Sequence, residues 1–194
     1  MPNYRRALVP GATWFFTVVL ARRGSNLLVT YIDALRTAIR TTRRERPFRI
    51  DAMVVLPDHL HAIWTLPPVD SDFPTRWRLI KSRFSRAIPA PGRTTWSRTR
   101  KSERGIWQRR YWEHLIRDEA DLLQHVDYCH FNPVKHGLVT NPAEWPYSTF
   151  HRDVRRGLYP SEWGVEFDCR VGAPHPPCDI DFGEMAGSKN PSYS

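Results

Sequence analysis

The chain has 194 residues, 41% of them hydrophobic, which is enough for one packed domain and excludes a low-complexity or wholly disordered chain. Its formal net charge is +9, and arginine supplies 25 of the 29 basic residues. Arginine forks onto phosphate and stacks on bases, so this excess beside eight tryptophans favours a nucleic-acid partner. A GC-rich genome would also favour arginine codons, but it would not explain the net charge.

The cysteine pattern and the apolar runs bear on the compartment. Cys129, Cys169 and Cys178 form no C-x-x-C pair, and their odd number fits poorly with a disulfide framework. The apolar runs are far shorter than a membrane span, and the N-terminus lacks the apolar region of a signal peptide. We therefore expect a soluble protein of the cytoplasm.

The first half of the chain predicts three strands and one helix. Residues 14–21 are aromatic and β-branched, which is typical of a buried strand, and residues 27–40 repeat apolar side chains at helical spacing. Residues 48–56 and 59–66 are two further strands. The Pro-Asp pair between them predicts an antiparallel hairpin.

The second half predicts two more helices and a fourth strand. Residues 73–88 read as a helix, 89–104 as a mobile loop and 107–116 as a strand. A helix begins after Asp118 and is expected to end near Phe131, because proline disfavours a helical conformation in the residue before it. This preference is statistical, and the alternative is a helix that continues with a kink at Pro133.

This β-α-β-β-α-β order predicts an α+β protein with a ferredoxin-like antiparallel sheet. Both helices within the pattern would cover one face of the sheet and leave the other for chemistry. The last helix follows the pattern, and we expect one domain over residues 1–163. Residues 164–194 are rich in Pro, Gly and Ser, which predicts a weakly ordered tail.

Two histidines stand at the start of the third strand. Because side chains alternate along a strand, His59 and His61 share one face. Two imidazoles on a rigid strand are half of a metal site, which needs further ligands and open positions for a substrate oxygen.

The helix that ends in Asp-Tyr-Cys-His-Phe-Asn offers the other half. Tyr128 and Asn132 are four residues apart and lie one turn from each other on the same face. Asn132 offers an amide oxygen to a hard metal ion, and Tyr128 offers a phenol. A metal that polarises a phosphate, with positive charge that favours the phenolate, would let Tyr128 attack a DNA phosphate.

The motifs together resemble a known family. PDHLHAIW (57–64), GIWQRRYWEHLIRDEADL (105–122), YCHFNPVKHGLV (128–139) and WPYSTF (145–150) are similar to the REP-associated tyrosine transposases, over roughly residues 3–163. These are single-tyrosine members of the HUH endonuclease superfamily, related to the transposases of small bacterial insertion sequences. The usual Tyr-Ile-His reads Tyr-Cys-His here, and we expect Cys129 to be tolerated as a small apolar residue.

The resemblance implies a metal-dependent nick of single-stranded DNA through a covalent 5′-phosphotyrosine intermediate. Tyr128 matches the nucleophile, and His59, His61 and Asn132 match the ligands of Mg²⁺ or Mn²⁺. The expected partner is single-stranded DNA with imperfect palindromic hairpins of the REP type. The resemblance implies a monomer whose site is complete within one chain, although related small transposases are dimers.

Basic residues beside this site are candidates for DNA contact. They are Arg76, Lys81, Arg83, Arg86, Arg109 and Arg110, with Trp112 as a stacking platform. Their ordinary alternative is a solvated helix face, and for Trp112 a place in the core.

Several alternatives remain open. Tyr111 is a rival nucleophile, and Cys129 with His130 could complete a zinc site with the strand histidines. Asp58 is first a turn residue, although its carboxylate could orient an imidazole. Glu113 and His114 could touch the site, although a solvated strand surface is their ordinary role. The alternative function is a non-catalytic nucleic-acid binder, because RNA-binding domains use the same fold plan.

Overall fold

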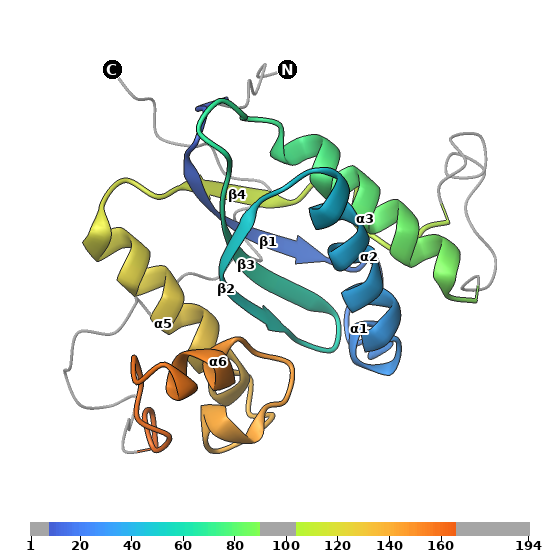
Figure 1. The fold of residues 1–194 in the computed structure, drawn as a ribbon. Helices are drawn as coiled ribbons and strands as arrows, with labels where there is room; N and C mark the ends of the chain where they lie inside the picture. The colour runs from blue at the N-terminus through green and yellow to red at the C-terminus, as the bar shows by residue number, and fades with distance from the viewer. Residues whose placement is uncertain (1–7, 90–103, 166–194) are drawn as a thin grey trace, which may run out of the picture.

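The computed structural model describes residues 8–89 and 104–165, which form one sheet with helices on both faces (Figure 1). The strands are β1 (Thr13–Val19), β2 (Arg49–Val55), β3 (His59–Thr65) and β4 (Trp112–Leu115). Their order in the sheet is β2-β3-β1-β4, and every neighbouring pair is antiparallel. This arrangement confirms the predicted α+β fold with a ferredoxin-like plan.

The helices divide between the two faces of the sheet. They are α1 (Leu27–Thr30), α2 (Ile32–Glu45), α3 (Phe73–Ala87), α5 (Glu119–Lys135) and α6 (Phe150–Arg155), with a short 3-10 helix, η1 (Pro142–Glu144). Helices α2 and α3 pack against each other on one face, while α5 lies against β2 and β3 on the other (Figure 1).

Alternation along β1 and β3 builds a separate apolar core on each face. Phe16 and Trp64 point toward α3, where Trp64 stacks on Trp77 with ring centroids 4.1 Å apart. Phe15 and Ile63 point the other way, into a smaller cluster that includes Cys129 of α5. The burial of Cys129 in this cluster fits its predicted role as a small apolar residue.

Two element boundaries differ from the predicted ones. The first helical segment is broken at Tyr31, whose φ of −112° and ψ of 38° separate α1 from α2. Helix α5 continues through Pro133 to Lys135, so the predicted end near Phe131 is wrong. Asn132 and Pro133 are both buried, and this packing outweighs the local preference of a residue before proline.

The fourth strand is shorter than the predicted 107–116, because Trp107 forms only an isolated bridge with Leu20 and β4 begins at Trp112. Most of the predicted loop and tail lie outside the described residues. None of the helices in residues 8–89 and 104–165 combines the length and apolar character that a membrane crossing requires.

Arg76 is a structural residue, and its predicted place on the solvent face of α3 is wrong. Its side chain is 1% exposed. The guanidinium donates to both carboxylate oxygens of Asp70, at 3.1 and 2.7 Å, and to the carbonyls of Arg46, Pro47 and Asp72. These hydrogen bonds connect the start of α3 to the end of α2. The prediction of Arg76 as a DNA contact is therefore corrected to a structural role.

Replacing Arg76 with methionine should lower the free energy of unfolding by about 3 kcal/mol, because Asp70 and three carbonyls lose their donor. Urea unfolding measures the change. Arg86→Met is the matched control, since Arg86 is exposed on the same helix and should change stability by less than about 0.5 kcal/mol. Equal effects of the two substitutions would contradict the structural role.

Candidate active site

Strand β3 places both histidines on the face covered by α5. The ring centroids of His59 and His61 lie 5.1 Å apart, and the residues are only 7% and 1% exposed. In the register with β1, His59 lies opposite Val19 and His61 opposite Thr17. The predicted pairing of the two rings on one face is therefore present.

Each imidazole is held through its Nδ1 atom. Nδ1 of His61 lies 2.9 Å from Oγ1 of Thr17, and Nδ1 of His59 lies 2.6 Å from Oδ1 of Asp58. Asp58 thus orients an imidazole in addition to its place in the turn, where it also accepts a hydrogen bond from the backbone N–H of Gly24. Anchoring through Nδ1 makes Nε2 the ring nitrogen with which either residue could bind a metal ion.

The environment favours neutral His61 and charged Asp58. Burial holds the pKa of His61 well below its usual range, and the cationic side chains around it act in the same direction. The hydrogen bond from His59 is the main cause that lowers the pKa of Asp58 to about 2. A neutral imidazole keeps the lone pair that a metal ion needs.

Helix α5 brings Tyr128 against His61. Their ring centroids are 5.0 Å apart in an edge-on contact, and Tyr128 also meets Phe15 at 5.9 Å. Nζ of Lys135 lies 5.2 Å from the centroid of the Tyr128 ring. The phenol is therefore beside both a histidine of the strand and a cation of its own helix.

Asn132 lies on one side of α5, between two residues of that side that touch the strand histidines. Tyr128, one turn before it, touches His61, and His136, one turn after it, meets His59 with ring centroids 5.1 Å apart. Asn132 thus faces the histidine pair. It is fully buried, and neither Oδ1 nor Nδ2 of its amide has a hydrogen-bond partner among the described residues. Buried amides are rarely left so, which fits a residue that binds a ligand.

The rival residues lie elsewhere. Tyr111 packs against the core on the opposite face of the sheet, 6.0 Å from Trp77. His130 is buried beside α6, with Nε2 3.3 Å from Oδ2 of Asp153. Tyr128 therefore lies beside the strand histidines and Tyr111 does not, and the contacts give no support to a zinc site of Cys129 and His130 with the strand histidines.

The basic residues of α3 lie across the sheet from the histidines. Nζ of Lys81 donates to the carbonyl of Gln108, and Arg83 donates to Thr42 and Glu45. Arg86 is exposed. The assumption that this helix adjoins the site is not met, because α3 covers the face opposite α5.

The candidates next to β4 are better placed. Arg109 and Arg110 are exposed immediately before the strand. Trp112 is half-buried on the α5 face, with its ring 5.6 Å from Phe15. These three residues stay predictions as DNA contacts.

Several residues in or beside the site were not predicted, although His114 was named as one that could touch it. Thr17, Lys135 and His136 each touch a predicted residue, as described above. His114, Asp121 and His125 form a separate cluster at the start of α5. The helical spacing of Asp121, His125 and Tyr128 is a signal that could have placed two of these on the site's face.

The sequence is similar to proteins of one family. An Escherichia coli (strain K12) REP-associated tyrosine transposase is 52% identical over 163 residues, which span 84% of this chain and 91% of the relative. The chain belongs to the REP-associated tyrosine transposases. A Haemophilus influenzae relative with the same family name is 44% identical over 172 residues, or 88% of this chain and 98% of the relative. No protein-family model matches the chain.

A solved structure of the family supports the same fold. A REP-associated tyrosine transposase bound to a REP hairpin superimposes with a TM-score of 0.74 at 48% identity, covering 89% of this chain and all of that one. The bound hairpin belongs to that protein. The fold and the sequence therefore both agree with membership in this family of transposases, whose similar members come from bacteria.

Asp58 should stabilise the site in a pH-dependent way. Because its folded pKa of about 2 lies below the usual 3.8, its stabilisation is present above about pH 4 and lost as the pH falls toward 2. Asp58→Asn should therefore cost about 1–2 kcal/mol at pH 7, and less as the pH falls below about 3.

Chemical denaturation at a series of pH values measures this difference. Asp33→Asn is the control, because the Asp33 side chain is 89% exposed and its removal should give no such pH-dependent difference. A cost for Asp58→Asn that stays constant from pH 7 to pH 2 would contradict the carboxylate's role.

Proposed function

We propose that this chain is a metal-dependent endonuclease and strand transferase for single-stranded DNA, acting through a covalent 5′-phosphotyrosine intermediate. One observation carries the proposal. The phenol ring of Tyr128 packs 5.0 Å from His61 within a single chain, and the same strand presents His59 beside it. The proposed nucleophile and the candidate metal ligands therefore lie together within one chain.

His59, His61 and Asn132 would hold the ion, which we propose to be Mg²⁺ or Mn²⁺. The donor set fits: two imidazoles are anchored through Nδ1, and one buried amide oxygen has no hydrogen-bond partner in residues 8–89 and 104–165. Three protein ligands leave positions for phosphate oxygens. The ion, when bound, would polarise the scissile phosphate and neutralise charge that develops on it.

Tyr128 supplies the nucleophile in this mechanism. The ammonium group of Lys135 lies 5.2 Å from the centroid of the Tyr128 ring, where its charge would stabilise a phenolate that attacks. The phenolate oxygen forms a bond to phosphorus while the bond from phosphorus to the 3′ oxygen breaks. The leaving oxygen takes a proton and becomes a 3′-hydroxyl, and the 5′ phosphate stays on Tyr128. Attack by another 3′-hydroxyl reverses these steps and rejoins DNA.

The DNA partner proposed is a single strand that carries an imperfect palindromic hairpin of the REP type. The similar structure at 48% identity is bound to such a hairpin, which supports the proposal for this chain. Arg109 and Arg110 are exposed beside Trp112, where phosphate contacts and base stacking would act together. We further propose that one chain suffices, and that the protein works in the cytoplasm.

The alternative is a non-catalytic nucleic-acid binder. RNA-binding domains of this plan use the sheet face opposite their helices to stack bases. Here that face is covered by α5, with Phe15, Ile63 and Tyr128 buried between the layers. The covered face favours the catalytic proposal.

Tyr128→Phe should abolish the covalent adduct between the protein and a labelled hairpin strand in the presence of Mn²⁺, because only the phenol oxygen is lost. A denaturing gel detects the adduct. Tyr111→Phe is the matched control and should still form it, since Tyr111 lies on the opposite face of the sheet. An adduct with the Tyr128→Phe protein would overturn the assignment, and no adduct with any hairpin-bearing strand would favour the binder.

Thr17→Val should raise the Mn²⁺ concentration for half-maximal cleavage roughly 10- to 100-fold, because His61 loses the group that orients it. Titration of Mn²⁺ in the cleavage reaction measures the change, and hairpin affinity should stay the same. Thr13→Val removes the equivalent hydroxyl from the same strand, where it contacts Thr65 instead of a histidine. A similar metal requirement in the two variants would count against His61 as a ligand.

His59→Ala should stop cleavage and leave the affinity for the hairpin largely unchanged, because the ring is assigned to metal binding. Binding to labelled DNA and cleavage are measured on the same preparation. Loss of both would mean that His59 holds the fold together or contacts DNA directly.

A further inference from the structure

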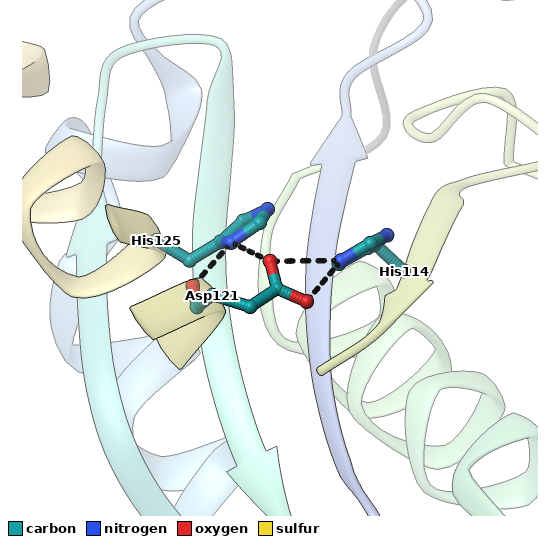
Figure 2. Close-up of side chains that lie close together, drawn as sticks. All are labelled: His114, Asp121 and His125. Carbon is teal, nitrogen blue, oxygen red and sulfur yellow. Dashed lines mark hydrogen bonds and ion pairs between the residues drawn. The ribbon is translucent and has the colours of Figure 1, made fainter. Parts of the chain in front are cut away.

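A second group of metal-binding side chains lies at the start of α5, apart from the strand histidines (Figure 2). His114 comes from β4, while Asp121 and His125 lie one turn apart on α5. The Asp121 carboxylate is 4% exposed and interacts with both rings, as Figure 2 shows, and the rings stack with their centroids 4.7 Å apart. A strand and a helix thus converge on one buried carboxylate.

The two oxygens of Asp121 have different surroundings. Oδ1 lies 3.1 Å from Nε2 of His114 and 3.1 Å from Nδ1 of His125. Oδ2 accepts from the backbone N–H of Arg117 at 3.0 Å and from its Nε at 3.2 Å, and it lies 2.9 Å from Nε2 of His114. Arg117 therefore orients the carboxylate so that Oδ1 faces both imidazoles.

We propose that His114, Asp121 and His125 form a second metal site, which takes a first-row transition dication of the Zn²⁺ class. Two imidazoles and one carboxylate are a common ligand set for such ions. In the tetrahedral geometry that Zn²⁺ prefers, ligands about 2.1 Å from the ion are about 3.4 Å apart. Oδ1 lies 3.1 Å from each ring nitrogen, so these separations need to widen by only about 0.3 Å to take the ion. Remaining positions would hold water.

The residues around the cluster fit the support that metal ligands commonly have. Hydrogen bonds to Arg117 fix the carboxylate, as groups around a metal ligand commonly do. The alternative is a hydrogen-bonded cluster without an ion, in which Nδ1 of His125 donates to the carbonyl of Asp121, 2.8 Å away.

The second site lies beside the first without sharing a residue with it. The Phe15 ring contacts His125 at 4.7 Å and His61 at 5.5 Å between centroids. An ion held by His114 and α5 would join β4 to the helix that carries Tyr128. Its role would be to hold that helix in place, which is independent of the cleavage chemistry.

The test measures bound zinc in the full chain with the strand histidines removed. His59→Ala/His61→Ala protein is loaded with Zn²⁺, passed through a desalting column and analysed by mass spectrometry for metal content. We expect one zinc ion per chain in this background. Adding Asp121→Asn or His114→Gln should weaken zinc binding at least about tenfold, because asparagine lacks the charge of the carboxylate and glutamine lacks the imidazole nitrogen, while each keeps a polar group of similar size.

Glu119→Gln in the same background is the matched control, because Glu119 is an exposed carboxylate two residues from Asp121. It should retain the zinc ion. Melting temperatures in EDTA establish that each variant is folded, and His114→Gln serves if Asp121→Asn is not. No bound zinc in the background, or zinc that neither substitution removes, would overturn the proposal and leave the hydrogen-bonded cluster. Neither result depends on DNA cleavage.

Discussion

The contact between α5 and the histidine face of the sheet is the constraint on which the rest of the site depends. Phe15, Ile63 and Cys129 bury apolar surface between the two layers, and this packing sets where the helix lies. Tyr128 touches His61 and His136 touches His59 only in that position. A shift of α5 by one residue would turn Tyr128 about 100° around the helix axis and separate the phenol from the strand.

The rigidity of the strand contributes as much as the position of the helix. His61 lies on β3, an inner strand of the sheet that is hydrogen-bonded to β2 on one side and β1 on the other. Its Nδ1 atom is anchored on β1 by Thr17, which lies directly opposite. His59 is anchored by the residue before it in the turn. Groups held in this way need little reorganisation when a ligand binds, which favours tight and specific coordination.

Local patterns in the sequence predicted the elements but not all their ends. Hydrophobic periodicity and turn residues gave the four strands, and spacing along one helix put Tyr128 and Asn132 on one face. The end of α5 was wrong because the burial of Pro133 is a tertiary effect that a local preference cannot include. Arg76 was misjudged for a similar reason. Its side chain is buried, its partners are carbonyls and a carboxylate close by in the fold, and charge alone does not reveal them.

The position of Thr17 and the pairing of His114 with Asp121 show the limit more clearly. Each becomes meaningful only through its register or packing against another element, which no local spacing contains. The resemblance to a family identified His59, His61 and Tyr128 together, because it compares whole motifs instead of single elements. It gave no reason for Thr17, whose contribution lies in the cross-strand pair.

The two faces of the sheet differ in what they contribute to the molecule. On the α2 and α3 face, Phe16, Trp64 and Trp77 form the larger core, and a charged group such as Arg76 is fully paired there. On the α5 face the smaller core leaves room for polar groups, including the Asn132 amide that has no partner in the described residues. An unsatisfied buried amide costs free energy that the larger core can offset. The strand alternation that separates the two cores therefore also lets one face be stable while the other is arranged for binding.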